Sequence, residues 1–449
     1  MIGDYTDPKW ARHGALTLGY RDEIPEFNDR NFKIEGDNLY LDESNPTGNV
    51  KFTYTAPDGS YISKTYTFYY DKYLFDLDLD IKMPENLGMK EGVTLGWYTP
   101  LEPSEVNFKN DKDRLGGFFN GGDNFDYRDD LNDGKMRDIS SGITDWAATR
   151  TKYYSAIMIA ESAPGQEVIV LGNEITRPDP ERKPFKWKQF GIGITSNNPP
   201  DNFSWRLSIY TGPNDYDVLK EMGKNLSQLV YMGWKFFRPF AIFIHWVFVS
   251  LYKIIPNYGW VIVLFSFLMK LVFWPLSHKS AKSMHQMKQI QPKLQEIKAK
   301  YKDDPAKLQK ETMAAYKEYG VNPFGSCLPM LVQLPIFWAM FAVLSNAIEL
   351  RGAPFILWIT DLSQPDPTTK YIYVGVLPII MGIAMFIQQK MTVTDPKQKM
   401  MVYILPVVFT FLFSKWASGL VLYWTVFSIM GIAEQWFVKK RLEESAAGT

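Results

Sequence analysis

Polar and apolar residues alternate along residues 73–83, whose sequence is YLFDLDLDIKM. Every odd-numbered position there is apolar, and Asp or Lys occupies most of the positions between. A period of two over this length predicts a β-strand with one buried face. The segment FSWRLSIY at residues 203–210 repeats the pattern. The sequence APDGS at residues 56–60, between Tyr- and Thr-rich runs, predicts a hairpin turn.

Long helical periodicity is scarce before residue 210, and Gly, Asn, Asp and Pro interrupt the sequence often. We therefore expect residues 1–225 to form an all-β antiparallel sandwich domain. The polar stretch at residues 120–138 is rich in Gly and Asp. It could hold a cation, but it lacks the regular ligand spacing of a calcium loop, so a solvated loop is the simpler prediction.

After residue 210, long apolar segments replace this alternation. Five of them are long enough to cross a bilayer, which takes about 17–25 residues. They lie at approximately residues 258–276, 327–350, 371–389, 400–417 and 420–438. A sixth segment, residues 236–252, is short in its apolar run and carries basic residues at its edges. We expect residues 226–256 to be a linker and an amphipathic helix lying along the membrane surface, anchored by Trp234, Trp246 and Tyr252.

The net charge of zero conceals a division between the two halves. Residues 1–225 carry 26 basic and 37 acidic residues, a net charge of −11, and the remainder carries +11. With five spans, the loops at 277–326 and 390–399 and the C-terminal tail share one side and hold 16 Lys and Arg residues. The positive-inside rule then predicts that these basic loops are cytoplasmic and the acidic sandwich is external.

The basic loop at residues 277–322 carries a helical pattern of its own. Apolar residues recur every three or four positions from Met284 to Tyr301 and again from Leu308 to Tyr319. Between them, Asp304 is the expected N-cap and Pro305 the first helical residue of a second helix. We expect a cytoplasmic helical hairpin, either simply solvated or docking an anionic partner such as ribosomal RNA or lipid headgroups. The candidate docking residues are Lys288, Lys293, Lys298, Lys300 and Lys302.

One lysine lies inside the first predicted span. Lys270 is in the apolar segment LFSFLMKLVFWPL at residues 264–276, and Ser266, four positions earlier, shares its helical face. Charged residues within a membrane usually face a water-filled cavity or the interior of a bundle, which predicts a hydrated groove that Gln333 of the next span could also line. The alternative is that Lys270 extends toward the headgroups near Pro275, about 7.5 Å along the helix axis.

Enzyme motifs are absent from the sequence. There is no HExxH, GxSxG or P-loop, and the one cysteine, Cys327, cannot form an intramolecular disulfide. His278 and His285 share a helical face but have no third ligand for a metal. We expect neither enzymatic activity nor a cofactor or metal. A solute transporter or channel with an external sensing domain remains an alternative, as does a sugar-binding sandwich anchored by helices, although no internal repeat of the kind carriers often show is present.

Four ordered motifs resemble the YidC family of membrane protein insertases. They are VNPFGSCLPMLVQLPIFWAMF at residues 321–341, ELRGAPFILWITDLSQPDP at 349–367, TVTDPKQKMM at 392–401 and SGLVLYW at 418–424. The sandwich resembles, more weakly, the periplasmic β-supersandwich of this family. Family members begin with a transmembrane helix ahead of the sandwich. No signal peptide is visible at the start of this sequence, so we expect such a helix to precede residue 1.

The resemblance implies a five-helix transmembrane insertase core at residues 257–440 and a cytoplasmic tail at 441–449, in a bacterial inner membrane. It also implies a hydrophilic groove open to the cytoplasm and to lipid. Lys270 occupies the position of the family's groove arginine, which keeps the positive charge but loses the bidentate fork. Ser266 and Gln333 match other groove positions. The implied partners are nascent membrane polypeptides, the Sec translocon, the ribosome and membrane lipids, with no cofactor.

Flexible and aromatic side chains on the second and fourth spans could form an apolar slide for a substrate helix. Ordinary interhelical or lipid-facing packing is the alternative. The candidate slide residues are Met330, Phe337, Met340, Phe341, Phe409 and Phe413.

Overall fold

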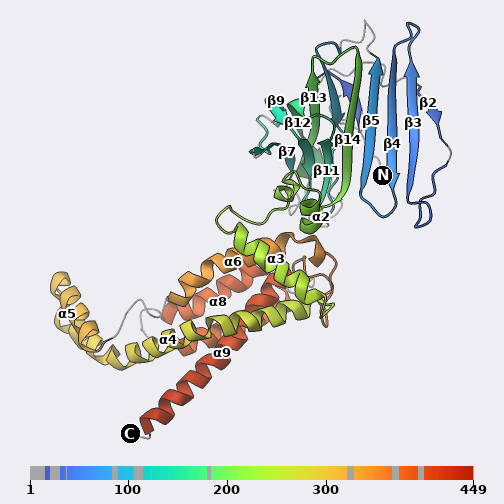
Figure 1. Ribbon diagram of the computed structural model, residues 1–449. Helices are drawn as coiled ribbons and strands as arrows, with labels where there is room; N and C mark the ends of the chain where they lie inside the picture. The colour runs from blue at the N-terminus through green and yellow to red at the C-terminus, as the bar shows by residue number, and fades with distance from the viewer. Residues whose placement is uncertain are drawn as a thin grey trace. The chain divides into compact units, whose positions relative to one another are not determined.

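The computed structural model (Figure 1) describes residues 16–20, 31–36, 38–82, 89–105, 115–122, 124–132, 134–178, 184–320, 328–366, 374–392 and 399–447. The chain divides into two compact units, Met1–Val230 and Tyr231–Thr449. The first unit is built mainly from strands, followed by α2 (Tyr216–Glu221) and the 3₁₀ turn η3 (Leu226–Leu229), and the second is built from helices, as the change in sequence pattern predicts.

Two antiparallel sheets make up the described part of the first unit. The larger has the order β2-β3-β4-β5-β14-β11-β10-β7-β8, and the smaller β1-β6-β13-β12-β9. The strands of the larger sheet are β2 (Lys33–Glu35), β3 (Thr47–Thr55), β4 (Tyr61–Tyr69), β5 (Leu74–Lys82), β14 (Asn202–Pro213), β11 (Tyr154–Ala160), β10 (Trp146–Arg150), β7 (Gly116–Gly121) and β8 (Asn124–Arg128). Those of the smaller are β1 (Thr17–Gly19), β6 (Gly92–Trp97), β13 (Phe185–Asn197), β12 (Gly165–Arg177) and β9 (Lys135–Thr144). The predicted all-β sandwich is confirmed.

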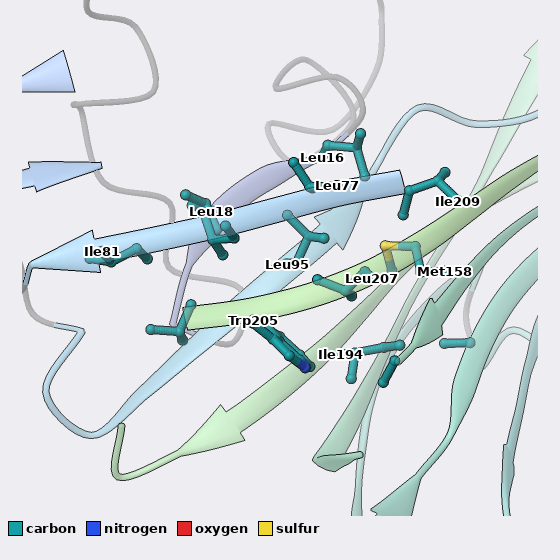
Figure 2. Close-up of a cluster of buried hydrophobic side chains, with 14 of the residues drawn as sticks. Leu16, Leu18, Leu77, Ile81, Leu95, Met158, Ile194, Trp205, Leu207 and Ile209 are labelled. Carbon is teal, nitrogen blue, oxygen red and sulfur yellow. The ribbon is translucent and has the colours of Figure 1, made fainter. Parts of the chain in front are cut away.

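The two strands predicted from alternation are neighbours in the larger sheet. β5 and β14 pair so that Leu77 lies opposite Leu207 and Leu79 opposite Trp205. All four side chains are buried, because a period of two turns them to the same face of the sheet. Figure 2 shows Leu77 and Leu207 in the buried cluster, together with Leu95 from β6 of the smaller sheet. The hydrophobic core therefore lies between the two sheets.

The predicted hairpin at residues 56–60 is confirmed. It joins β3 to β4, with the amide of Ala56 donating to the carbonyl of Ser60 at 2.9 Å. Gly59 adopts a φ of +81°, a conformation that glycine reaches without steric cost. The carboxylate of Asp58 accepts a hydrogen bond from the Ser60 amide at 2.9 Å, which closes the turn.

The polar stretch at residues 120–138 is not the solvated loop that its composition predicted. Its described residues include the end of β7, the whole of β8 and the start of β9. Arg128 bridges Asp126 at 2.8 Å and Asp138 at 2.6 Å. The prediction was wrong because Gly- and Asp-rich composition is equally typical of a tight hairpin, here the turn between β7 and β8.

The second unit is helical. Its described elements are α3 (Arg238–Tyr252), α4 (Tyr258–Lys300), α5 (Pro305–Glu318), α6 (Leu328–Asn346), the 3₁₀ turn η4 (Ile348–Leu350), α7 (Val376–Thr392), α8 (Lys399–Phe413) and α9 (Ser418–Ala447). Helix α9 packs against α4, α6 and α7, and α7 also packs against α8. Helix α3 lies on α6 and α4 (Figure 1).

Each of the five segments predicted to span a membrane contains a helix. Within the described residues, two helical stretches are long and apolar enough to cross a bilayer, Tyr258–Ser280 and Ser418–Val438. The apolar stretches in α6, α7 and α8 are shorter, at 10–17 residues. These three helices adjoin segments outside the described residues, so five spans remain a prediction.

Helix α4 continues beyond residue 276, the last residue of the first predicted span. It runs for 43 residues, with Pro275 and Pro292 inside it. The side chain of Asn257 caps its start by accepting from the Trp260 amide at 3.2 Å. A proline removes only one helical hydrogen bond, and the surrounding turns and neighbouring groups can tolerate the loss. The first arm of the predicted hairpin is therefore a continuation of α4.

The second arm of the hairpin begins as predicted. The carboxylate of Asp304 accepts from the Lys307 amide at 3.0 Å, and Pro305 is the first residue of α5. Helix α5 packs against α4, and Ile290 and Ala315 are buried. Tyr319, which the sequence placed on the buried face of this helix, is 49% exposed.

Helix α3 has two apolar faces. Ala241, Ile244, His245 and Phe248 are buried at helical spacing, while large aromatic side chains point outward. The exposed aromatic residues are Phe240, Phe243 and Trp246. The imidazole of His245 lies 2.7 Å from the carboxylate of Glu349. With 15 residues, α3 is short for a span, and its outer aromatic face suits a membrane surface.

Candidate functional site

The ammonium group of Lys270 is buried inside the helical unit and paired. Its Nζ donates to Oε2 of Glu434 on α9 at 2.8 Å. Both residues are 6% exposed. Lys270 is therefore held within the bundle against α9, and its position relative to the lipid headgroups stays a prediction. Sequence analysis located the lysine but missed its partner.

Three further residues shape the surroundings of this pair. The ring centroid of Phe427 lies 4.5 Å from Nζ of Lys270, close enough for a cation–π interaction. A Cβ atom at Gly431 would clash with Nε2 of Gln388 and would lie 3.5 Å from the Lys270 Nζ. Glycine therefore lets α7 and the lysine approach α9 closely. The side chain of Gln388 on α7 therefore lies beside the lysine.

Ser266 and Gln333, the other predicted groove residues, do not join this pair directly. The Ser266 hydroxyl donates to the carbonyl of Ile262 at 2.7 Å, so its hydrogen bond lies within α4. Gln333 forms a hydrogen bond with Tyr423 on α9. Tyr423 and Glu434 are about 16 Å apart along the α9 axis, at 1.5 Å per residue. The structure thus places Lys270 and Gln333 at different depths of the bundle.

The candidate slide residues lie mostly around a cluster of rings. Phe337 lies 5.1 Å from Trp424, and Phe341 lies 5.1 Å from Trp416, measured between ring centroids. Phe413 contacts both tryptophans and also Phe409. Phe413 and Met340 are buried, as the packing alternative requires, while Phe337, Phe341 and Phe409 are half-buried. The side chain of Met330 lies outside the described residues, and the slide remains a prediction.

The hairpin lysines lie on the outside of α4 and its turn. Lys293, Lys298, Lys300 and Lys302 are exposed, and Lys293 lies 3.4 Å from Glu296. The side chain of Lys288 falls outside the described residues. Docking of an anionic partner to these lysines remains a prediction.

The sandwich contains a pocket that the sequence analysis did not identify. It has a volume of about 390 Å³ and is lined by Phe32, Phe52, Lys64, Tyr66 and Phe68. Burial lowers the pKa of Lys64 to about 8 and raises the pKa of Tyr66 to about 12. The Nζ of Lys64 donates to the carbonyl of Leu16 at 2.9 Å. Alternation of Lys64, Tyr66 and Phe68 along β4 is the signal that could have found this face.

Metal chemistry has no support in the part of the chain that the structure describes. No three His, Cys, Asp or Glu side chains there lie close enough together to hold a metal ion. The polar centre at Lys270 is instead a buried ion pair among apolar helices, joined in one chain to an antiparallel β-sandwich. Together with two helical stretches long and apolar enough to cross a bilayer, these features are those of a membrane protein that also carries a β-sandwich domain.

Comparison with known proteins identifies the family. The family model described as 60Kd inner membrane protein matches residues 250–445, and that of the YidC periplasmic domain matches residues 7–247. The membrane protein insertase YidC of Geobacter sp. (strain M21) is 37% identical over 411 residues, covering 88% of this chain and 71% of the relative. That of Nitratidesulfovibrio vulgaris (strain DP4) is 35% identical over 441 residues, covering 93% and 76%. The chain belongs to the YidC family of membrane protein insertases.

One solved structure was also matched. The crystal structure of an active YidC insertase with its first transmembrane domain resolved covers 91% of this chain and 83% of its own, with 20% identity and a TM-score of 0.41. The relatives are named as insertases and not as enzymes, in agreement with the expectation that this chain is not an enzyme.

Proposed function

We propose that this protein inserts nascent membrane proteins into the inner membrane of a bacterium. Helices α4, α6, α7, α8 and α9 are its five spans, residues 1–225 lie in the periplasm, and the basic loops lie in the cytoplasm. The family and the excess of Lys and Arg in those loops support this arrangement.

The observation that carries the proposal is the buried pair of Lys270 and Glu434. An ionisable side chain is costly inside a bilayer, by roughly 2.5–3.5 kcal/mol on insertion scales, and usually marks a functional path. Here two such side chains meet between α4 and α9, with the amide of Gln388 beside them. These groups line a hydrophilic groove open to the cytoplasm and to lipid. A polar segment of a client enters this groove without losing all of its hydration partners.

The energy for insertion comes from the client and from the membrane. The apolar helix of a client leaves the groove for lipid, with about 0.8 kcal/mol gained for each buried methylene group. For an acidic tail moving outward, the membrane potential adds about 2.3 kcal/mol per charge per 100 mV. No nucleotide or cofactor is required. The half-buried rings of Phe337, Phe341 and Phe409 offer the client helix an apolar surface on its way out.

The remaining partners are assigned by the chemistry of the exposed surfaces. The lysines of the hairpin suit ribosomal RNA at the site where a nascent chain emerges, or anionic lipid headgroups. The outer aromatic face of α3 suits the membrane interface. The protein acts alone or beside the Sec translocon, which would accept the larger clients.

Site-specific crosslinking to a stalled client tests the proposal. A photo-reactive amino acid at Phe409, which faces the ring cluster, should capture a ribosome-bound nascent membrane protein. The same group at Phe411, 58% exposed on another face of α8, is the matched control and should capture mainly lipid. Equal capture at both positions would contradict the groove. Ion or solute flux through the purified protein without any client would favour the transporter or channel alternative.

A further inference from the structure

The lysine of the groove does not stand alone, and its partner changes how the groove can work. Lys270 and Glu434 lie 2.8 Å apart and are both buried, so the centre of the groove carries a positive and a negative charge together. An empty groove of this kind is close to neutral. Attraction of an acidic client by an isolated cation therefore cannot be the whole mechanism.

The pair also has hydrogen-bonding capacity to spare. Oε1 of Glu434 is buried and accepts no hydrogen bond from the described part of the chain. The ammonium group of Lys270 has three N–H donors, and the bond to Glu434 accounts for one of them. Buried polar atoms in folded proteins usually have partners, so an unfilled acceptor beside spare donors indicates a place for other polar groups.

Fold stability alone does not explain the pair. Replacing a buried ion pair by apolar side chains of similar size is often neutral or stabilising, whereas removing one partner leaves a costly unpaired charge. A bundle that only needed to pack would therefore be served as well by two apolar residues. The presence of both charges, with Gly431 making room for Gln388 beside them, points to a role in handling clients.

We propose that Glu434 is an exchangeable counter-ion for Lys270 and sets the preference of the groove for acidic clients. This inference rests on the proposed insertase function. In the protein without a client, the Glu434 carboxylate accepts a hydrogen bond from the Lys270 ammonium group. An acidic side chain of an entering polypeptide competes for the same donors, and Glu434 regains them as the client leaves.

The competition has two consequences. Two carboxylates around one ammonium group repel each other, so Glu434 weakens the hold of the groove on an acidic tail. It also speeds release, because the ammonium group is never left without a partner when the client departs. An acidic client should therefore be inserted and released without being trapped. A neutral client meets a groove in which Lys270 is already paired with Glu434.

Insertion of two matched clients into vesicles tests this role. The clients are single-span proteins that differ only in having Asp or Asn in the translocated tail, and the readout is protease protection by the full chain in proteoliposomes. Glu434→Gln should raise the ratio of acidic to neutral client by about tenfold, the factor that 1.4 kcal/mol produces. The ratio is taken either from the amounts of client inserted or from the amounts retained in crosslinks at Phe409. Glu161→Gln, which breaks an exposed Lys–Glu pair of the same 2.8 Å length in the sandwich, should leave both quantities unchanged.

The double variant Lys270→Gln, Glu434→Gln guards against misfolding, because it leaves no unpaired charge in the bundle. It should insert both clients equally. An acidic preference identical to that of the unmodified protein, in either the single or the double variant, would overturn the role of Glu434. Failure of the unmodified protein to insert either client above protein-free vesicles would instead overturn the proposed function itself.

Discussion

A buried lysine was visible in the sequence, but the carboxylate that neutralises it was not. Lys270 interrupts an apolar run, and the free-energy cost of a charge in a bilayer marks it as a candidate functional residue. Glu434 lies near the end of the last predicted span, followed closely by Lys439 and Lys440, where a charge is expected at the membrane surface. Pairing between residues 164 positions apart depends on how α4 and α9 pack, which no local pattern reports. The sequence therefore predicted one charge of the site and missed the other.

Lys270→Ala should abolish most insertion, and Lys270→Arg should retain it, because arginine keeps the charge and reaches Glu434. Alanine also leaves the Glu434 carboxylate buried and unpaired, so the variant should lose about 3–5 kcal/mol of stability. Protease protection of a client measures activity, and thermal unfolding in detergent measures stability.

The double variant Lys270→Met, Glu434→Met separates these two effects. It should unfold at or above the temperature of the unmodified protein, since apolar residues replace the pair, but it should still insert poorly. Normal insertion by this double variant would show that the charges only support packing.

Lys64 in the sandwich pocket predicts a pH dependence of stability. Burial lowers its pKa to about 8 in the folded chain from about 10.5 in the unfolded one, so the unfolded state binds more protons between these values. The contribution of Lys64 therefore opposes folding below pH 8, by at most about 3 kcal/mol, and this penalty is relieved as the pH rises toward 10.5.

The variant Lys64→Met removes this titration. At pH 7 it should unfold at a higher temperature than the unmodified chain, and the difference should shrink by pH 9.5, as followed by the circular dichroism of the sheets. Above pH 10 the raised pKa of Tyr66 acts in the opposite direction, so the comparison stops there. A difference that stays constant from pH 7 to 9.5 would contradict the assignment.

At the level of elements, alternation and capping signals predicted more than composition did. The period of two in β5 and β14 identified both strands and their buried faces, because it follows directly from strand geometry. Asp304 and Pro305 correctly marked the start of α5. The Gly- and Asp-rich composition of residues 120–138 did not reveal the strands that the structure shows there. Signals that follow from backbone geometry were confirmed, and composition alone was not a guide to the local fold.

The cap of α5 gives a prediction at this level. Asp304→Ala removes the acceptor for the Lys307 amide and should cost about 1 kcal/mol of local stability. Hydrogen exchange of the α5 amides should quicken by about fivefold, while exchange in α9 stays the same. Asp303→Ala is the matched control, because its neighbour Asp304 makes the cap. Equal effects of the two variants would show that general charge, and not the cap, stabilises the helix.

For the molecule as a whole, charge and pattern predicted two bodies before any contact was known. The division after Val230 falls close to the domain boundary predicted at residue 225, with a net charge of −11 before it. The pocket around Lys64 could not be placed in the same way, because it combines side chains from β3, β4 and the residue before β2. These residues lie on or next to neighbouring strands, and the closeness of Phe32 to Lys64 depends on how those strands pair and pack.

The orientation of the two bodies across the membrane follows from charge and can be tested with single cysteines. Cys327 is replaced by serine, and a cysteine is placed either at Tyr40, 80% exposed in the sandwich, or at the exposed Lys302 of the hairpin. A membrane-impermeant maleimide should label position 40 in spheroplasts and position 302 only in inverted membrane vesicles, because the positive-inside rule retains the lysine-rich hairpin in the cytoplasm. Permeabilised membranes, in which both positions should react, control for accessibility. Labelling of both positions from the same side would require an even number of spans between residues 40 and 302, and would make α3 a transmembrane helix.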